Sequence, residues 1–219
     1  KPAAYQKEQD PIRGVFAYVA DGLLQPGEEA PAHQPQLLPG QVKLKNINGD
    51  DKLNEEDMVL IGRNDPKFIF GFNNNFSYKN FDLNIYMYGQ VGKIAGANSY
   101  YDAWGSYGNR IKLGQNVPVS FKDAWSSDNQ TSTRPSFIES AYGTGDLFLQ
   151  KISFLRIRNI TLGYTVPISK SICNRLRVYA DINNPCVWTN WKGQDPETDS
   201  NTNAYPNVTS FSIGVDISF

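Results

Sequence analysis

The chain has 219 residues, of which 13% are aromatic and 20% are charged, and its formal net charge is −1. This length suits one large domain or two small ones, and the near-neutral charge leaves no electrostatic footprint for nucleic acid. No run approaches the ~20 consecutive apolar residues that a membrane-spanning helix needs. Membrane-spanning β-strands are not excluded, because a strand that alternates apolar and polar residues has a low mean hydropathy.

Residues 1–66 have no sustained hydrophobic period and are rich in Pro, Gly, Gln and Asn. We expect this region to be mostly loop, with a short strand and turn within residues 14–24. The chain begins at Lys1 without a signal peptide, so we expect a mature form or a piece of a longer protein.

Two alternating segments, 68–78 and 81–90, are separated only by Lys79-Asn80. In both segments every second residue is apolar, with few exceptions, and the residues between them are mostly polar or small. A period of two indicates an extended strand whose faces meet different environments. The two-residue connection predicts a tight β-hairpin.

Three more alternating segments, 148–166, 176–187 and 208–219, follow along the chain. In the first of these, the apolar parity changes near Arg158-Asn159, which predicts a β-bulge. The connections alternate in length, short at 79–80 and 167–175 and long at 91–146 and 188–207. Outer-membrane barrels have short periplasmic turns and longer extracellular loops, so the long connections are interpreted as extracellular.

About five long strands cannot close a membrane barrel, because the smallest such barrels have about 8 strands. An open strand edge in hydrocarbon would leave backbone groups unpaired. We therefore predict an all-β fold that forms part of a larger antiparallel transmembrane β-barrel. The alternative is a secreted β-sandwich that binds glycans through loop aromatics, in which the apolar face would be a protein core.

Several blocks resemble the C-terminal region of SusC-like (SusC/RagA-type) TonB-dependent outer-membrane transporters. They are KNINGDDKLNEEDMVLIGRNDPKFIFGFNNNFSYKNFDLNIYMYGQ, DAWSSDNQTSTRP, SFLRIRNITLGYTVP, LRVYADINNPCVWTNWKGQDPE and the terminal strand. The resemblance covers most of residues 41–219. It implies a barrel of about 22 strands, with residues 1–66 as an extracellular loop region and 67–219 as the C-terminal barrel strands.

The resemblance also implies import of oligosaccharides, or of peptides, across the outer membrane of a Gram-negative bacterium. The implied partners are a SusD-like lipoprotein lid, TonB through an N-terminal part missing from this sequence, the plug and remaining barrel, and the lipid bilayer. No enzymatic activity is expected, because His33 is the only histidine and lies in a Pro-rich loop, and neither cysteine has a partner at a recognisable spacing. No cofactor is required, and calcium is the one candidate.

The calcium candidate is the stretch NINGDDKLNEED, residues 46–57, which has the spacing of an EF-hand or dockerin-type loop. The oxygen ligands would be Asn46, Asn48, Asp50, the Lys52 carbonyl, Asn54 and Asp57. Only two of these side chains are charged, so the affinity expected is about 10⁻⁴–10⁻³ M. The alternative is an Asx-rich turn bonded to its own backbone. A further alternative is a calcium-dependent surface adhesin, in which ligand binding would depend on calcium in this loop.

Tyr86, Tyr88 and Gln90 fall on the polar face near the outer end of a predicted strand. We predict that they line the upper lumen and contact substrate, with lumen packing as the alternative. Arg156, Arg158, Arg177 and Asp181 are also predicted to project inward. The expected arrangement there is a ladder of charges in which Asp181 pairs with an arginine across the hairpin.

Three tryptophans, Trp104, Trp188 and Trp191, fall in or beside the predicted outer loops. Their rings are candidates to stack on sugar rings, and the alternative is an interfacial aromatic belt or loop packing. The terminal Phe219 closes an alternating strand, which resembles the outer-membrane assembly signal. A lipid-facing position is compatible with that role.

Overall fold

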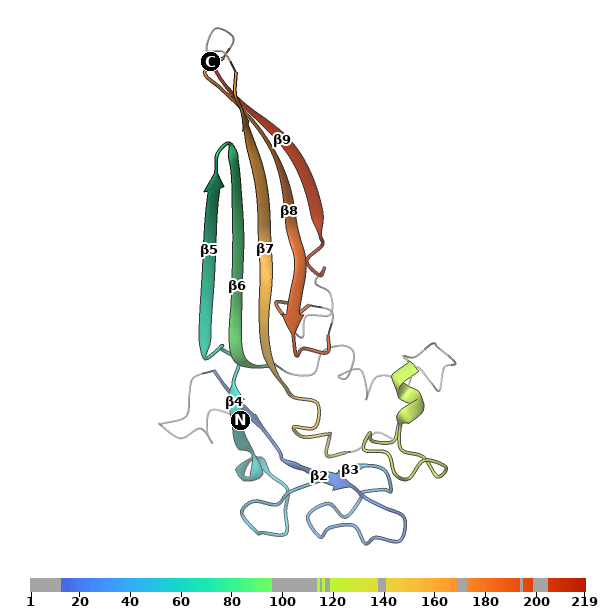
Figure 1. Cartoon of the computed structure of the whole chain (residues 1–219). Helices are drawn as coiled ribbons and strands as arrows, with labels where there is room; N and C mark the ends of the chain where they lie inside the picture. Colours follow the sequence, from blue (N-terminus) through green and yellow to red (C-terminus); the bar gives the residue numbers. More distant parts are fainter. Residues whose placement is uncertain are drawn as a thin grey trace. The chain divides into compact units, whose positions relative to one another are not determined.

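The computed structural model describes residues 13–95, 114, 116, 119–137, 141–168, 173–193, 195–198 and 205–219. The chain divides into two compact units (Figure 1). The first comprises Lys1–Asp65, Ile94–Gln150 and Asp199–Thr202, and the second comprises Pro66–Lys93, Lys151–Thr198 and Asn203–Phe219. Within the described residues, no helix is both long enough and apolar enough to cross a membrane.

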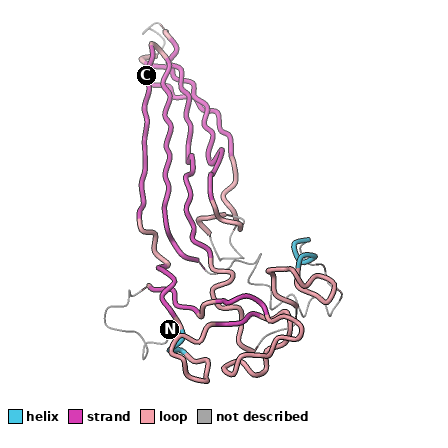
Figure 2. Tube along the Cα trace, turned by 60° about the horizontal axis from the view of Figure 1, so that its bottom comes forward, coloured by secondary structure: helices cyan, strands magenta, loops and turns pink. Residues whose placement is uncertain are grey.

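The second unit is built on a five-stranded antiparallel sheet in the order β5-β6-β7-β8-β9. Its strands are β5 (Phe68–Tyr78), β6 (Phe81–Ala95), β7 (Gln150–Val166), β8 (Arg175–Thr189) and β9 (Ser210–Ser218). Figure 2 shows these strands side by side as long magenta tubes. All five predicted strands are present. The first has the predicted bounds, β6 runs to Ala95 instead of ending at residue 90, and the others shift slightly at their ends.

The predicted hairpin and bulge are both present. Tyr78 pairs with Phe81, so Lys79-Asn80 is the whole connection, and Lys79 has the positive φ of 53° that tight hairpin turns use. The register of β7 against β8 shifts between Ile157 and Asn159. Opposite that shift, Asn184 has a φ of 50°. Because of the bulge, the apolar residues of β7 before it and after it lie on the same face of the sheet.

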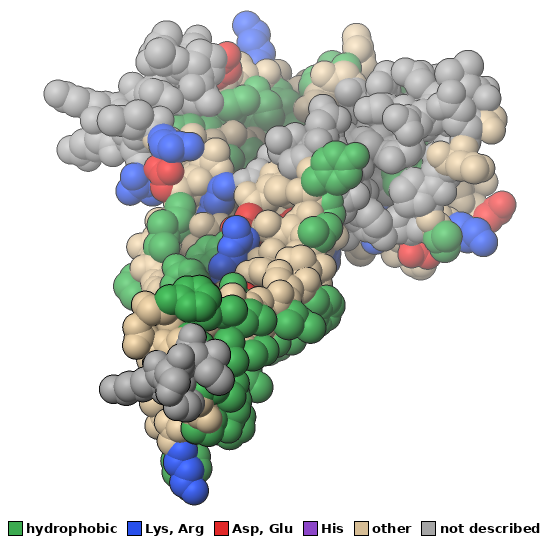
Figure 3. All heavy atoms as spheres, turned by 90° about the horizontal axis from the view of Figure 1, so that it is seen from above, with side chains coloured by type: hydrophobic (Ala, Val, Ile, Leu, Met, Phe, Trp, Pro, Cys, Tyr) green, Lys and Arg blue, Asp and Glu red, His purple; other side chains and the backbone are tan. Residues whose placement is uncertain are grey.

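Alternation therefore creates an apolar face and a polar face. Large side chains of the apolar face are exposed at Phe68, Phe72, Phe76, Tyr78, Phe81, Leu162, Val178, Phe211, Ile213, Val215 and Ile217. Figure 3, which looks along the strands, shows hydrophobic side chains exposed along the sheet. Soluble monomers rarely expose so large a contiguous apolar patch, so this face needs an apolar environment.

The sheet also has two open edges, because β5 and β9 each pair on one side only among the described strands. An open edge of long strands is a template for further pairing. Together with the exposed apolar face, the two edges mark the sheet as a segment of a larger sheet.

The first unit contains four short strands, whereas the sequence predicted only a short strand and turn within residues 14–24. β1 (Gly14–Ala17) pairs with β4 (Val59–Arg63), and β2 (Ala20–Leu23) pairs with β3 (Val42–Leu44). The expectation of mostly loop was wrong for β3 and β4, because strands this short carry too few residues to display a period.

A small core holds part of this unit together. Leu23, Val42 and Leu44 are buried, and Trp125 packs against them. Gly40 has a φ of +84°, and a Cβ there would overlap the Trp125 indole. Two 3₁₀ turns, η2 (Glu55–Asp57) and η3 (Val119–Asp123), also belong to this unit.

Candidate functional site

The polar face of the sheet carries the tyrosines predicted from the sequence. Asn73 pairs with Tyr86, and Ile69 pairs with Gln90. The rings of Tyr86 and Tyr88 are stacked, with centroids 6.4 Å apart, and Tyr88 meets the Phe154 ring edge-on at 5.7 Å. The predicted residues therefore lie on one face, in an aromatic row that continues from β6 onto β7.

Phe154 was missed by the sequence analysis, although a signal for it exists. The bulge reverses the parity of β7, so the residues before it on the polar face are Phe154 and Arg156. Both are almost fully buried, at 5% and 2% exposure. Contact of these tyrosines with substrate stays a prediction.

The predicted tryptophans are not brought together with the tyrosines. Trp188 pairs with Leu155 on the apolar face and is 55% exposed. With Phe70, Val91 and Leu155 it lines a shallow hollow of about 450 Å³. Contact of Trp188 with a sugar ring stays a prediction. Trp191 is buried in the chain that follows β8, and Trp104 lies outside the described residues.

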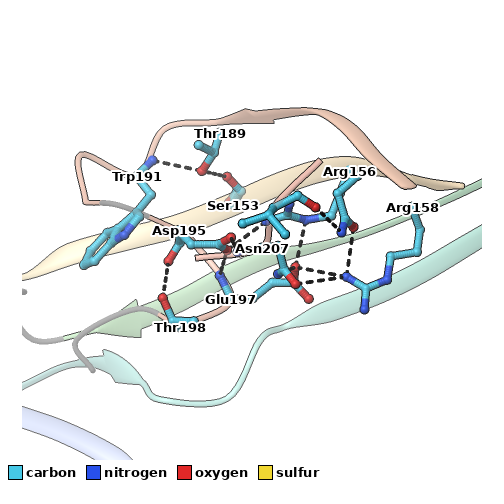
Figure 4. Close-up of polar contacts among 11 residues, drawn as sticks. Ser153, Arg156, Arg158, Thr189, Trp191, Asp195, Glu197, Thr198 and Asn207 are labelled. Atoms are coloured by element: carbon cyan, nitrogen blue, oxygen red, sulfur yellow. Dashed lines mark hydrogen bonds and ion pairs between the residues drawn. The ribbon is translucent and has the colours of Figure 1, made fainter. Parts of the chain in front are cut away.

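A buried ionic cluster joins β7 to the segment after β8 (Figure 4). Arg156 Nη2 donates to Asp195 Oδ1 at 2.8 Å, and Arg156 Nε lies 2.7 Å from Glu197 Oε2 in an ion pair. The side chains of Arg156 and Asp195 are 3% and 4% exposed. This arrangement confines one positive and two negative charges to a site with little water.

Asn207 closes the same cluster from the far end of the loop. Its backbone N–H donates to Asp195 Oδ2 at 3.0 Å, and its Nδ2 donates to Glu197 Oε2 at 2.7 Å. Arg158 Nη1 donates to the Oδ1 of Asn184 at 3.0 Å. The two ends of the loop are thus bound to each other and to the polar face of β7.

The protonation state of Asp195 sets a pH limit on this cluster. Burial by itself would raise the pKa of Asp195, but hydrogen bonds from the backbone N–H groups of Glu197 and Asn207, with the charge of Arg156, leave it below the ordinary value of 3.8. A carboxyl with a lowered folded pKa contributes stability that is complete above its ordinary pKa and is lost as pH falls through the folded pKa.

We therefore expect the loop to stay closed from neutral pH to about pH 4 and to open below that value. Pepsin cleavage of the full protein within residues 190–198, followed across acid pH, measures the opening. Asp195→Asn is expected to be cleaved at every pH tested. The same acid profile in that variant would contradict the assignment to Asp195.

A second charged cluster spans four strands nearer the hairpin end of the sheet. Arg177 on β8 donates from Nε and Nη2 to the two carboxylate oxygens of Asp82 on β6, at 3.0 and 2.5 Å. Its Nη1 reaches Asp216 on β9 at 3.3 Å. The guanidinium crosses β7 at Gly163, where any Cβ would overlap it. The predicted charge ladder exists, but the pairing of Asp181 with an arginine is wrong, because the partner of Asp181 is the Thr161 hydroxyl at 2.5 Å.

The predicted calcium loop, which belongs to the first unit, is closed by its own hydrogen bonds. Asn46 Oδ1 accepts from Gly49 N at 2.7 Å, and Asp50 Oδ1 accepts from Lys52 N at 2.9 Å. Asn48 Oδ1 accepts from Asp50 N at 3.1 Å. Asn54 caps η2 by accepting from Glu56 N at 2.7 Å. These are the Asx hydrogen bonds of the alternative interpretation.

Asp57, the last predicted ligand, is fully buried at 0% exposure. Its Oδ1 accepts from Ile47 N at 2.8 Å, and its Oδ2 accepts from Asn54 N at 2.9 Å. Within the described part of the chain, no three His, Cys, Asp or Glu side chains gather as a metal-binding group. Calcium binding stays a prediction.

The chain is similar in sequence to known TonB-dependent receptors. The chain is 27% identical over 236 residues to TonB-dependent receptor P3 of Formosa agariphila, a match covering 97% of this chain and 23% of that receptor. It is 26% identical over 180 residues to TonB-dependent receptor SusC of Bacteroides thetaiotaomicron, covering 78% of this chain and 17% of SusC. No family model matches the chain.

Among solved structures, the RagAB peptide transporter has the same fold, with a TM-score of 0.71 and 22% identity. That match covers 94% of this chain and 22% of the solved chain. The chain therefore spans less than a quarter of the proteins to which it is similar. The chain is a homologue of the SusC-like TonB-dependent receptors, and its five long strands are a segment of a larger antiparallel β-barrel.

Proposed function

We propose that this chain is part of a TonB-dependent importer in the outer membrane of a Gram-negative bacterium. The importer takes up oligosaccharides or peptides together with a SusD-like surface lipoprotein, and it is not an enzyme. The single observation that carries this proposal is a one-layer sheet with an exposed apolar face and two open edges, in a homologue of TonB-dependent receptors.

The two faces of the sheet then have separate roles. The apolar face contacts lipid, and the polar face, with Tyr86 and Tyr88, lines the lumen. In this arrangement the hairpin turn at Lys79-Asn80 is periplasmic, and the segment held by the Arg156 cluster lies at the extracellular end. Phe219 follows β9 and is 87% exposed, and its role as an assembly signal stays a prediction.

The proposal is tested on the parent protein from isolated outer membranes. We expect a polypeptide roughly four times the 24.5 kDa of this chain, because the chain spans 23% of the P3 receptor. A surface lipoprotein should co-purify with it, and its uptake activity should require TonB. A soluble species of 24.5 kDa would instead favour the secreted β-sandwich.

A charge on the apolar face provides a second, energetic test. Ile213 is 84% exposed in β9, and we expect Ile213→Arg to cost about 2–4 kcal/mol, as a cation does near the bilayer midplane. Ile217→Arg, nearer the end of β9, should cost less because the penalty falls toward the interface. Urea unfolding of the parent protein in lipid measures both. Equal costs at the two positions would argue against lipid contact.

A further inference from the structure

We propose that the shallow hollow beside Trp188 binds a phosphorylated lipid of the outer leaflet, with an acyl chain in the hollow and the phosphate against Lys151 and Ser153. The hollow and these two residues are called the lipid site below. The inference rests on the proposed function, because it requires the apolar face to contact the outer membrane. One lipid then occupies a defined position on that face.

The apolar part of the lipid site lies at the end of the sheet opposite the Lys79-Asn80 turn. Its volume is about 450 Å³, within the range of about 300–1,000 Å³ that ligand pockets have. Gly89 places no side chain at this point of β6, and a Cβ there would lie 2.7 Å from the Phe70 ring. The apolar lining comes from four strands, through Phe70, Val91, Leu155 and Trp188.

Ser153 forms the polar end of the hollow and is held from both sides. Asn190 Oδ1 accepts from Ser153 N at 2.8 Å, and Thr189 Oγ1 donates to Ser153 O at 3.0 Å (Figure 4). From the other side, Gly92 N donates to Ser153 Oγ at 3.2 Å. The Ser153 hydroxyl donates to none of the residues that the structure describes, so its O–H is available to a phosphate oxygen.

Lys151 supplies a positive charge beside that hydroxyl. It lies two residues before Ser153 on β7, so both side chains leave the same face of the strand, about 6.6 Å apart. Lys151 is exposed and makes no ion pair with a described residue. The stretches around the hollow, 66–78, 83–93, 151–166 and 185–192, contain no Asp or Glu. A lipid phosphate therefore meets a cation that these stretches do not neutralise.

The order of the groups along β7 selects the class of ligand. Lys151, Ser153 and Leu155 follow one another on one face, so a charge, a hydroxyl and an apolar side chain come in that order toward the middle of the sheet. Trp188 stands opposite Leu155, and tryptophan is enriched at the level of the headgroups. A phosphorylated lipid has the same order of phosphate, polar linkage and acyl chain. A free anion would leave the hollow empty, and a neutral lipid would leave Lys151 without a counter-charge.

The test uses the full parent protein, purified in a detergent that contains no phosphate. It is incubated with monophosphoryl lipid A and with the same lipid after enzymatic removal of the phosphate, and bound lipid is measured by native mass spectrometry. We expect the phosphorylated form to bind at least fivefold more tightly. Lys151→Gln should weaken its binding about fivefold, the factor that one lysine contributes near an anionic headgroup. The same variant should leave binding of the dephosphorylated form unchanged.

Lys79→Gln is the matched control, because Lys79 carries the same charge in the turn at the other end of the sheet. It should bind both forms as the unmodified protein does. A further variant, Leu155→Trp, fills part of the hollow and should weaken binding of both forms.

Three results would overturn the lipid site and leave an importer in place. They are equal binding of the two lipid forms, equal weakening by Lys151→Gln and Lys79→Gln, and a dimer of the parent protein whose contact covers Trp188. A parent protein that stays soluble without detergent would count against the proposed function as well.

Discussion

Replacing Arg156 with methionine is expected to cost about 3–5 kcal/mol and to release the loop that begins after β8. The substitution keeps much of the side-chain volume but leaves the buried Asp195 and the partly buried Glu197 without their shared cation. Breaking a buried ion pair by removing one partner costs this much because the remaining charge is uncompensated. The side chain of Asp195 is 4% exposed, so water cannot replace the arginine without opening the loop.

Hydrogen exchange of the full protein measures this opening. The backbone N–H groups of Glu197 and Asn207 both donate to Asp195, and their exchange should accelerate by at least a hundredfold in Arg156→Met. Arg158→Met is the matched control on the same strand, because the Arg158 side chain is 44% exposed and donates to Asn184 and Asn207 instead of to Asp195. Equal acceleration in both variants would show that the loop is not held through Arg156.

Replacing Asp57 with alanine is expected to unfold the 46–57 loop at a cost of about 3–5 kcal/mol. The substitution leaves the part-buried backbone N–H groups of Ile47 and Asn54 without an acceptor, and an unsatisfied donor costs up to about 1–3 kcal/mol as its burial increases. It also removes half of the capping box on η2, in which Asn54 is the N-cap. The loop would lose both the hydrogen bonds that Asp57 accepts and the 3₁₀ turn η2.

Limited proteolysis within residues 46–57 measures this loss, with and without a calcium chelator. Asp51→Ala is the control, because Asp51 lies in the same loop but is exposed. We expect Asp57→Ala to be cleaved under both conditions and Asp51→Ala under neither, because hydrogen bonds hold the loop. Cleavage of the unmodified protein by chelator alone would show instead that bound calcium maintains the loop.

Local patterns in the sequence determined much of the sheet. The period of two placed five strands and assigned Tyr86, Tyr88 and Gln90 to one face, because alternation is a property of each strand by itself. The two-residue spacing determined the hairpin, and the parity change near Arg158-Asn159 determined the bulge. The apolar parity and the impossibility of closing five strands also predicted a segment of a larger barrel, with a β-sandwich as the alternative.

The ends of the strands could not be predicted from local patterns. As a result, the structure changes the interpretation of Trp188. The pattern ended the strand at residue 187 and placed Trp188 in a loop, whereas β8 continues to Thr189. The cause is a cap: Asn190 accepts from Ser153 N and donates to Lys151 O with its side chain, which extends the pairing with β7. That contact joins residues distant in sequence, so no local pattern contains it.

The polar partners were decided only by the tertiary structure. Arg156 meets Asp195 across 39 positions of sequence, and Arg177 meets Asp82 across 95. The sequence indicated that these arginines face the polar side, because facing follows from parity. Which carboxylate each one reaches depends on strand register, on Gly163 leaving space above β7, and on the loop folding back. Side-chain direction is a local property of a strand, whereas charge pairing belongs to the assembled sheet.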